Sequence, residues 1–211
     1  KGLNLVFEET QVFNPKDSVV SMEIFLKNLL VEKGKWNTKE TYKKNKPGDI
    51  YEYSNIGTTL AAFVLEKATG ETFDKFTTEY ILRPLKMNAS GWHFEDINFA
   101  NYSKLYENPK TVLPFYGMVS YPDGNFITSM NDLSLYLSEL IKGYNGNGTI
   151  LSKESFKEYF KPQLGANNFI DRNDKNPFSE SYNVGIFIGF GYTGYIGHTG
   201  GDPGVGSMMF F

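Results

Sequence analysis

The chain has 211 residues, of which 40% are hydrophobic and 16% aromatic, so it can bury a sizeable core in one domain or in two closely packed lobes. Its 21 Lys and Arg against 24 Asp and Glu give a net charge of −3 with no long single-sign block, which argues against strong binding to nucleic acid or an acidic membrane. The absence of cysteine excludes disulfides, thiolate metal ligands and a cysteine nucleophile, and two distant histidines make a histidine-rich metal site implausible.

The two ends of the sequence are both unusual for a whole domain. No signal-peptide pattern is present and the first residue is Lys1, while the last residues, 207–211, stop inside an apolar run. No apolar run approaches the roughly 20 residues that span a bilayer, so we expect no transmembrane segment in this chain. We expect residues 1–211 to be an interior portion of one domain, helix-rich over residues 15–165 and with antiparallel strands over residues 184–211.

Helices are predicted wherever a capping residue precedes apolar positions at helical spacing and a glycine or proline follows them. They run from Asp17-Ser18 or Ser21 to Gly34, from Ser54-Asn55 to Gly70, from Thr72 to Arg83-Pro84, from Ser129 to Gly143, and from Ser152 to Pro162. Residues 1–14 and 85–121 show no sustained period. We expect a loop in the first and an irregular, packed segment in the second, with Trp92-His93-Phe94 in an aromatic cluster.

The pattern changes from helical to β in the last part of the chain. Residues 165–182 are rich in Asn, Asp and Pro and predict a long loop. Strands are predicted over residues 184–190, 192–198 and 205–211, joined by turns that contain glycine. Helices followed by antiparallel strands favour an α+β fold.

The stretch Gly-His-Thr-Gly-Gly-Asp-Pro-Gly, residues 197–204, carries the first functional signal. We expect a strand to end in a Gly/Pro-rich turn here, with the chain returning beside it. Four glycines in eight residues allow close approach of a ligand to the backbone, and His198 lies at the edge of that backbone. A hairpin with an incidental histidine is the alternative.

Tyr53-Ser54-Asn55 lies where an extended segment meets a predicted helix. Residues two apart on an extended segment point to the same side, so the Tyr53 phenol and the Asn55 amide can converge on one cleft. The structural alternative is that Asn55 is the N-cap of the helix and that Tyr53 fills the core.

Tyr53-Ser54-Asn55 followed by His198-Thr199-Gly200-Gly201 resembles the second and third motifs of the penicillin-recognising serine hydrolases. This family includes class C β-lactamases, D-alanyl-D-alanine carboxypeptidases and related esterases and D-aminopeptidases. The likeness covers most of residues 47–211, although Asn125 stands where a second glycine is usual. It implies a β-lactamase/transpeptidase-like fold, a helical lobe packed on an antiparallel sheet, with no metal or organic cofactor. It also implies export to the cell envelope, periplasmic or extracellular.

The resemblance implies a catalytic role for three residues of this sequence. Tyr53 would work with a lysine to take a proton from a serine and deliver it to the leaving group. Asn55 would donate a hydrogen bond to an amide carbonyl of the substrate. His198 would bind the substrate's carboxylate or carbonyl.

The resemblance also implies that Thr199, Gly200 and Gly201 bind the substrate. Thr199 would act with the preceding histidine on the substrate carboxylate or carbonyl. The backbone N–H of Gly201 would form half of an oxyanion hole. A substrate strand lying against this edge requires an unobstructed main chain, which explains the density of glycine.

The first motif of the family, Ser-x-x-Lys, does not occur in the 211 residues. The nearest partial match to this motif is Thr72-Phe73-Asp74-Lys75. It follows Tyr53, whereas the family's nucleophile precedes the tyrosine motif. We therefore expect the nucleophile before Lys1 and an inactive chain in isolation. The expected function is a serine acyl hydrolase acting on D-alanyl peptides of the peptidoglycan type, β-lactams or small esters through an acyl-enzyme.

Two alternatives stay open at this point. One is a catalytically inactive β-lactamase-like domain that binds or senses a ligand, because the nucleophile is missing from the sequence. The other is an envelope module that binds carbohydrate or peptide through its aromatic residues.

Overall fold

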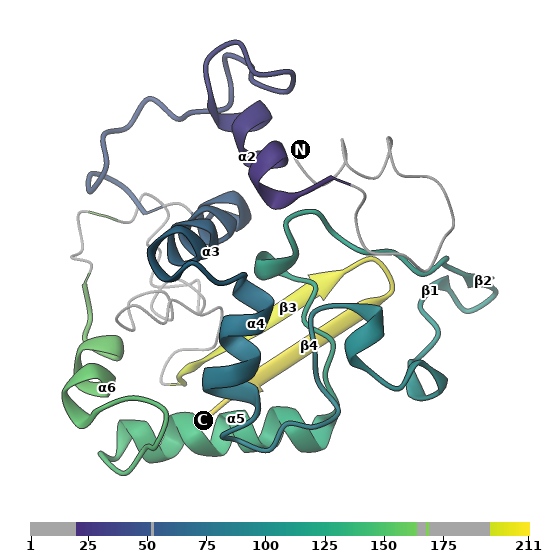
Figure 1. Ribbon diagram of the computed structural model, residues 1–211, viewed down its shortest axis with the longest axis vertical. Helices are drawn as coiled ribbons and strands as arrows, with labels where there is room; N and C mark the ends of the chain where they lie inside the picture. The colour runs from purple at the N-terminus through teal and green to yellow at the C-terminus, as the bar shows by residue number, and fades with distance from the viewer. Residues whose placement is uncertain (1–19, 52, 164–167, 169–194) are drawn as a thin grey trace, which may run out of the picture. The chain divides into compact units, whose positions relative to one another are not determined.

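The computed structural model describes residues 20–51, 53–163, 168 and 195–211 (Figure 1). Helices and short antiparallel strands together confirm the α+β class. The chain divides into two compact units, which are described separately below. The first comprises residues 1–44, 53–79 and 89–128, and the second comprises residues 45–52, 80–88 and 129–211.

The α-helices are α2 (Met22–Leu30), α3 (Asn55–Thr69), α4 (Phe73–Thr77), α5 (Met130–Tyr144) and α6 (Lys153–Tyr159). A π-helical segment, η1 (Thr78–Leu82), follows α4, and 3-10 turns form η2 (Phe94–Asp96), η3 (Phe99–Asn101) and η4 (Tyr121–Asp123). The strands are β1 (Tyr106–Asn108), β2 (Thr111–Val112), β3 (Gly197–Asp202) and β4 (Val205–Phe210). None of the helices within these described ranges is long and apolar enough to cross a membrane.

A serine is the N-cap residue of four of these five α-helices. The hydroxyl groups of Ser21, Ser54, Ser129 and Ser152 each accept a hydrogen bond from the backbone N–H three residues on, at distances of 3.0–3.3 Å. Such a cap satisfies a helix N–H that has no partner within the helix. The caps predicted from sequence are therefore confirmed at these positions, whereas Asp17-Ser18 lies outside the described residues.

The predicted ends of the helices are confirmed in part. Gly70 ends α3 in the left-handed conformation, with φ 77°, as its position in the sequence predicts. The prediction that Gly34 ends the first helix is wrong, because α2 already ends at Leu30 and Val31 is extended. The Val31 N–H still bonds to the carbonyl of Lys27 at 3.2 Å, so the last turn is closed without a glycine.

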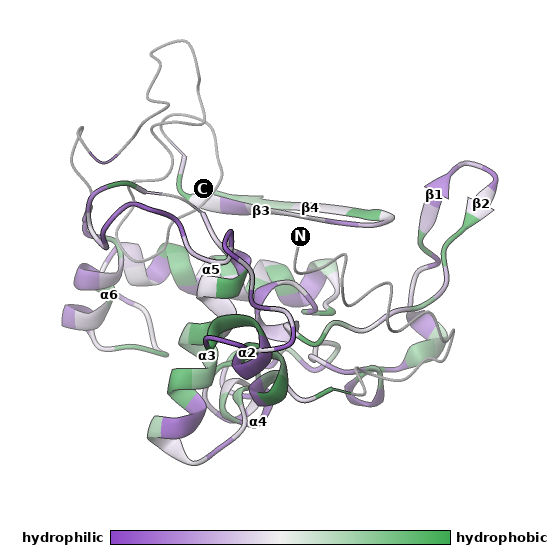
Figure 2. Cartoon of the chain, turned by 90° about the horizontal axis from the view of Figure 1, so that it is seen from above, coloured by the Kyte–Doolittle hydropathy of each residue, from purple (hydrophilic) through white to green (hydrophobic). Residues whose placement is uncertain are grey.

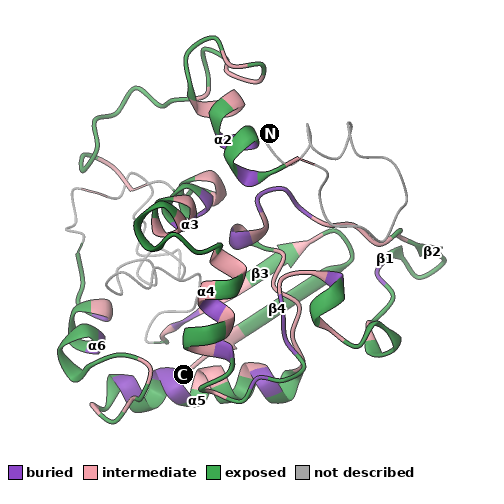
Figure 3. Ribbon diagram, in the orientation of Figure 1, coloured by how far each residue is buried: buried purple, intermediate pink, exposed green. Residues whose placement is uncertain are grey.

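The core of the first unit lies between α2 and α3. The buried side chains are those of Met22, Phe25, Leu26 and Val119, and Ile56 and Phe63 of α3 pack against them. Hydrophobic residues cover much of α3 (Figure 2), and the buried positions of α2 are visible in Figure 3.

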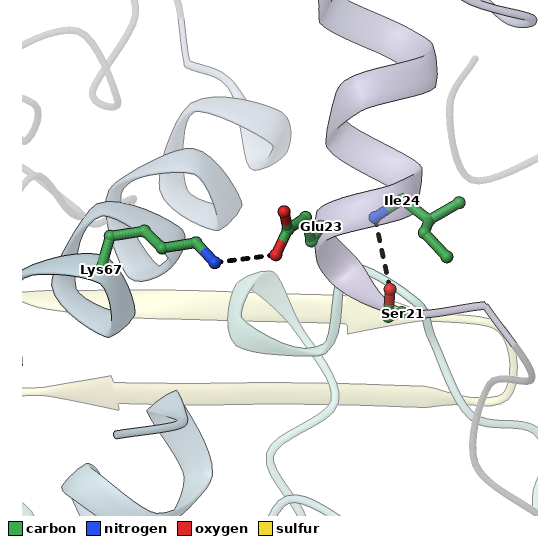
Figure 4. Close-up of polar contacts among 4 residues, drawn as sticks. All are labelled: Ser21, Glu23, Ile24 and Lys67. Atoms are coloured by element: carbon green, nitrogen blue, oxygen red, sulfur yellow. Dashed lines mark hydrogen bonds and ion pairs between the residues drawn. The ribbon is translucent and has the colours of Figure 1, made fainter. Parts of the chain in front are cut away.

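An exposed ion pair also joins α2 to α3. Lys67 Nζ lies 2.7 Å from Glu23 Oε2 (Figure 4). The Lys67 ammonium also lies 4.7 Å from the centre of the Phe63 ring. The hydrogen bond from Lys67, followed by its positive charge, lowers the pKa of Glu23 below its ordinary value of 4.5.

The irregular segment of the first unit is held by aromatic packing, as the sequence predicts. The Trp92 ring lies 4.8 Å from Phe126 and 5.0 Å from Phe73, and the His93 ring lies 5.0 Å from Tyr121. Phe94 is buried among the rings of Phe99, Tyr102 and Phe115. The same segment contains the short β1–β2 hairpin, which the sequence did not predict.

The core of the second unit lies between α5, α6 and the β3–β4 hairpin. Leu140, Phe156 and Phe160 are buried, and the residues Ile196, Met209 and Phe211 pack against them. The connection between the two helices is held by Glu139, whose side chain is only 2% exposed. Its carboxylate accepts hydrogen bonds from the N–H of Thr149, from the Thr149 hydroxyl at 3.1 Å and from the N–H of Ile150 at 2.9 Å.

The glycine-rich stretch is itself a strand, so the predicted turn over residues 197–204 is wrong in extent. β3 pairs antiparallel with β4 in continuous register from Gly197↔Phe210 to Asp202↔Val205. The turn consists only of Pro203 and Gly204, and Gly204 has φ 80°. Proline followed by a glycine of positive φ is typical of a type II turn. The predicted strand 205–211 is confirmed as far as Phe210, while the predicted strand 184–190 lies outside the described residues.

Candidate active site

The start of α3 is shaped by Ser54. This residue is extended, with φ −145° and ψ 112°, and its hydroxyl accepts from the N–H of Gly57 at 3.0 Å. Ser54 is therefore the N-cap, and Asn55 is the first residue of the helix. The alternative in which Asn55 is the N-cap is wrong. Helix capping therefore does not explain why an amide side chain stands at this position. Tyr53, immediately before the cap, is 41% exposed and does not fill the core.

A buried hydrogen bond supports the same end of α3. Thr59 is completely buried, and its hydroxyl donates to Asp123 Oδ2 at 2.9 Å. Thr59 lies four residues after Asn55, so the two residues share a face of the helix. The bond ties this face to η4 within the first unit. The sequence does not reveal that Thr59 and Asp123 form a pair, because the two residues are 64 positions apart.

The register of the β3–β4 hairpin determines which backbone groups are open to a ligand. Ile196 and Phe211 exchange two hydrogen bonds, each of 2.9 Å. In an antiparallel ladder such pairs alternate with pairs that make no mutual hydrogen bonds. Thr199 and Gly201 therefore direct their N–H and C=O groups away from β4, toward the other edge of β3. No strand in the described part of the chain pairs with that edge.

His198 lies opposite Met209 and on the same face of the hairpin as Ile196, because side chains two apart in a strand share a face. The imidazole is partly buried, and its Nδ1 is hydrogen bonded to the carbonyl oxygen of Thr199. A carbonyl oxygen only accepts, so Nδ1 carries the proton. In the neutral ring the other nitrogen, Nε2, then carries no hydrogen and is a hydrogen-bond acceptor.

Asp202 ends β3 on the same face as His198. Burial raises the pKa of the Asp202 carboxyl above its ordinary value of 3.8. This carboxyl therefore binds a proton more readily than an exposed aspartate does. It is an acidic group close to the turn of the hairpin.

The structure places the predicted site residues in two sets. Tyr53 and Asn55 flank the cap of α3 in the first unit, whereas the four residues 198–201 follow one another along β3 in the second. Within each set, exposed or backbone groups suited to bind a substrate lie next to one another. That the two sets face one cleft stays a prediction.

The comparisons with known proteins point to one family. Residues 37–211 match the model of the beta-lactamase family. Protein flp of Staphylococcus aureus (strain MW2) is 24% identical over 99 residues, which cover 44% of this chain and 20% of flp. The chain thus matches about a fifth of the length of this curated relative.

Two solved structures share the fold. The octameric penicillin-binding protein homologue from Pyrococcus abyssi aligns with a TM-score of 0.62 and 20% identity, over 90% of this chain and 41% of that protein. The D-amino acid amidase from Ochrobactrum anthropi SV3, in complex with L-phenylalanine amide, aligns with a TM-score of 0.56 and 21% identity, over 76% of this chain and 46% of that protein. The predicted β-lactamase/transpeptidase-like fold is confirmed.

Proposed function

Since the chain belongs to the beta-lactamase family of serine hydrolases, we propose that it forms part of the active site of a serine acyl hydrolase. The substrates would be D-alanyl peptides of the peptidoglycan type, β-lactams or small esters. One observation carries the proposal: the register of β3 directs the N–H of Gly201 toward an edge with no strand partner among the described residues, three residues after His198.

The reaction requires a serine nucleophile, which we expect before Lys1. Its oxygen would attack the substrate carbonyl carbon, and its proton would pass through the Tyr53 phenol to the leaving group as the scissile bond breaks. Water would then release the acyl group from the serine. A free phenol titrates near pH 10, so a neighbouring cation, such as the family's lysine, would be needed for Tyr53 to relay a proton at neutral pH.

The remaining site residues would bind and orient the substrate. The Asn55 amide would donate to an amide carbonyl on the acyl side. The Thr199 hydroxyl and His198 Nε2–H, when the ring is protonated, would bind a carboxylate or carbonyl on the leaving-group side. The N–H of Gly201 would stabilise the negative charge that develops on the carbonyl oxygen in the transition state.

The proposal also covers a further class of substrate, amides of amino acids, and the location of the protein in the cell. The solved D-amino acid amidase, which binds L-phenylalanine amide, supports amides of amino acids as one more substrate class. We propose a periplasmic or extracellular location for the protein. Its distribution between the envelope and cytoplasmic fractions of the cell tests this point.

The experiment that tests the function uses the full-length protein with a fluorescent penicillin and with an activated ester such as p-nitrophenyl acetate. We expect covalent labelling that unlabelled penicillin prevents, or ester turnover with an acyl-enzyme burst. Gly201→Pro replaces an N–H that points away from β4 by a ring carbon, which removes the donor and occupies its place, and proline is tolerated at such edge positions. We expect it to lower the acylation rate by about 10²–10³-fold.

The matched comparison is Gly201→Ala, which retains the N–H and should lose much less activity. Thermal unfolding of both variants tests whether the fold is intact. Neither acylation nor turnover, where a control enzyme is labelled, would contradict the proposal. Penicillin binding without acylation would instead support the inactive, ligand-binding alternative.

A further inference from the structure

The connection between α5 and α6 contains the only two Asn-Gly dipeptides of the sequence, Asn145-Gly146 and Asn147-Gly148. Both asparagines are exposed. Asparagine followed by glycine is chemically labile, because glycine has no side chain to shield its backbone nitrogen and lets the chain bend toward the asparagine side chain. The hydrogen bonds of the two dipeptides differ, and this difference determines which asparagine reacts.

Hydrogen bonds hold both reacting groups of the first dipeptide. The Asn145 side-chain amide donates to the carbonyl oxygen of Ile141 at 2.8 Å. The N–H of Gly146 donates to the carbonyl oxygen of Gly143 at 3.0 Å. Deamidation requires the side-chain carbonyl carbon to meet the next backbone nitrogen after that nitrogen has lost its proton. Both hydrogen bonds must break first, so the fold protects Asn145.

The second dipeptide lacks this protection. The Asn147 side-chain amide makes one weak hydrogen bond, 3.5 Å long, to the carbonyl oxygen of Asn145. Within the described part of the chain, no group accepts a hydrogen bond from the N–H of Gly148. The Asn147 side chain can therefore turn toward that nitrogen without the loss of a strong hydrogen bond.

We propose that Asn147 is a site of spontaneous deamidation, and that isoaspartate formed there destabilises the second unit. The Gly148 nitrogen loses its proton to hydroxide and forms a bond to Asn147 Cγ. The bond from Cγ to the side-chain nitrogen breaks, and this nitrogen takes a proton from water and leaves as ammonia. Water then adds to one of the two carbonyls of the cyclic imide and opens the ring. The product is aspartate, or isoaspartate when the main chain continues through Cγ.

Isoaspartate adds one carbon atom to the main chain directly before a tightly packed residue. A Cβ on Gly148 would lie 2.1 Å from Phe156 Cε2, so the backbone has no room to move toward this ring. The next two residues, Thr149 and Ile150, donate their N–H groups to the buried Glu139 carboxylate. A lengthened main chain displaces these donors, and a buried carboxylate that loses its hydrogen bonds lowers stability.

The experiment incubates the full-length protein in mildly alkaline buffer and follows the tryptic peptide of residues 143–153, which contains both asparagines. Mass spectrometry measures the mass gained when NH is replaced by O, and fragmentation assigns the gain to one position. We expect Asn147 to react at least about fivefold faster than Asn145, because two hydrogen bonds protect the latter. In the urea-unfolded chain, where those bonds are absent, the two rates should become similar.

Asn147→Gln should remove most of the mass gain, because glutamine closes the corresponding larger ring much more slowly. Asn145→Gln is the matched control and should leave the reaction at position 147 unchanged, since it retains the backbone carbonyl at position 145.

The melting temperature tests the effect of the product on stability. The isoaspartate fraction, separated by ion exchange and identified by methylation with a protein isoaspartate methyltransferase, should melt a few degrees below the untreated protein. Asn147→Asp carries the new charge on an unaltered main chain and should melt close to the untreated protein.

Three results would overturn the inference. If Asn145 reacts as fast as Asn147 in the folded protein, or if Asn147 gains no mass, the assignment of the site is wrong. If the ratio of the two rates is the same in urea, the hydrogen bonds do not cause the difference. If the isoaspartate fraction and Asn147→Asp melt at the same temperature, the lengthened main chain does not destabilise the unit. None of these results depends on acylation, so the proposed function is tested separately.

Discussion

The start of α3 and the β3–β4 hairpin present candidate site groups in opposite ways. At α3 the hydroxyl of Ser54 and the buried Thr59–Asp123 hydrogen bond fix the backbone that carries Tyr53 and Asn55. Along β3 the important feature is the lack of side chains, which leaves the backbone of residues 200 and 201 exposed. The comparison shows that the first set depends on side-chain hydrogen bonds, while the second depends on strand register and on the core beneath the hairpin.

The largest effect should come from the support of the hairpin's unit. Glu139→Ala removes a buried carboxylate and leaves two backbone N–H groups and the Thr149 hydroxyl without their acceptor. We expect the free energy of unfolding to fall by about 3 kcal/mol, measured by urea denaturation. Glu139→Gln keeps one acceptor oxygen and should lose less. Equal stability of Glu139→Ala and the wild type would mean that this carboxylate does not hold the connection between α5 and α6.

The next effect concerns the start of α3. Thr59→Val preserves the shape of the side chain but removes the hydrogen bond to Asp123, so we expect a loss of about 1–2 kcal/mol in the free energy of unfolding. Thr59→Ser keeps the hydroxyl and serves as the control. If Asp123→Ala and Thr59→Val prove additive in a double-mutant cycle, the two side chains are not coupled and the description of this region is wrong.

A smaller loss is expected when the cap of α3 is removed. Ser54→Ala deprives the Gly57 N–H of its acceptor and should cost about 1 kcal/mol, measured by thermal or urea unfolding. Ser54→Asp, which can also cap, is the control. Asn55→Ala should change stability less than Ser54→Ala but slow acylation more. The reverse order would indicate that Asn55, not Ser54, maintains the helix start.

The smallest effect is the pH dependence of the exposed Glu23–Lys67 pair. Lys67 lowers the pKa of Glu23, so the folded state favours the charged carboxylate. The contribution to stability is present above pH 4.5 and is lost as pH falls through the lower pKa of the folded state. We expect Glu23→Gln to melt slightly below the wild type at neutral pH and at the same temperature in acid, with Glu32→Gln as a control for the charge itself. A difference that persists in acid would rule out this ion pair as its cause.

The sequence predicted the helix starts well because a cap is a local pattern. Ser54 and Ser129 each precede an apolar repeat and accept a hydrogen bond three residues away, so a short window of sequence contains the whole signal. The ends were less reliable, as α2 shows, because Val31 closes that helix without any characteristic residue.

Features that depend on distant parts of the chain were not predicted. The glycines at 197, 200 and 201 indicated a turn, yet pairing with β4 keeps them in a strand. The β1–β2 hairpin was missed because its strands have three and two residues, all exposed, so no alternation of polar and apolar residues marks them. Of the site, the two motifs were found from sequence, whereas Thr59, Asp123 and the outward direction of the Gly201 N–H required the structure.

We propose that the α3 set and the β3 set act on one substrate, and a double-mutant cycle on acylation tests this proposal most directly. The second-order rate of acylation of the full-length protein by a fluorescent penicillin is compared for wild type, Asn55→Ala, Thr199→Val and the double variant. We predict that each single change slows acylation and that the double variant is faster than the product of the two effects requires, because both residues hold the same bound molecule. Strictly multiplicative effects, or no effect of either change, would contradict the claim.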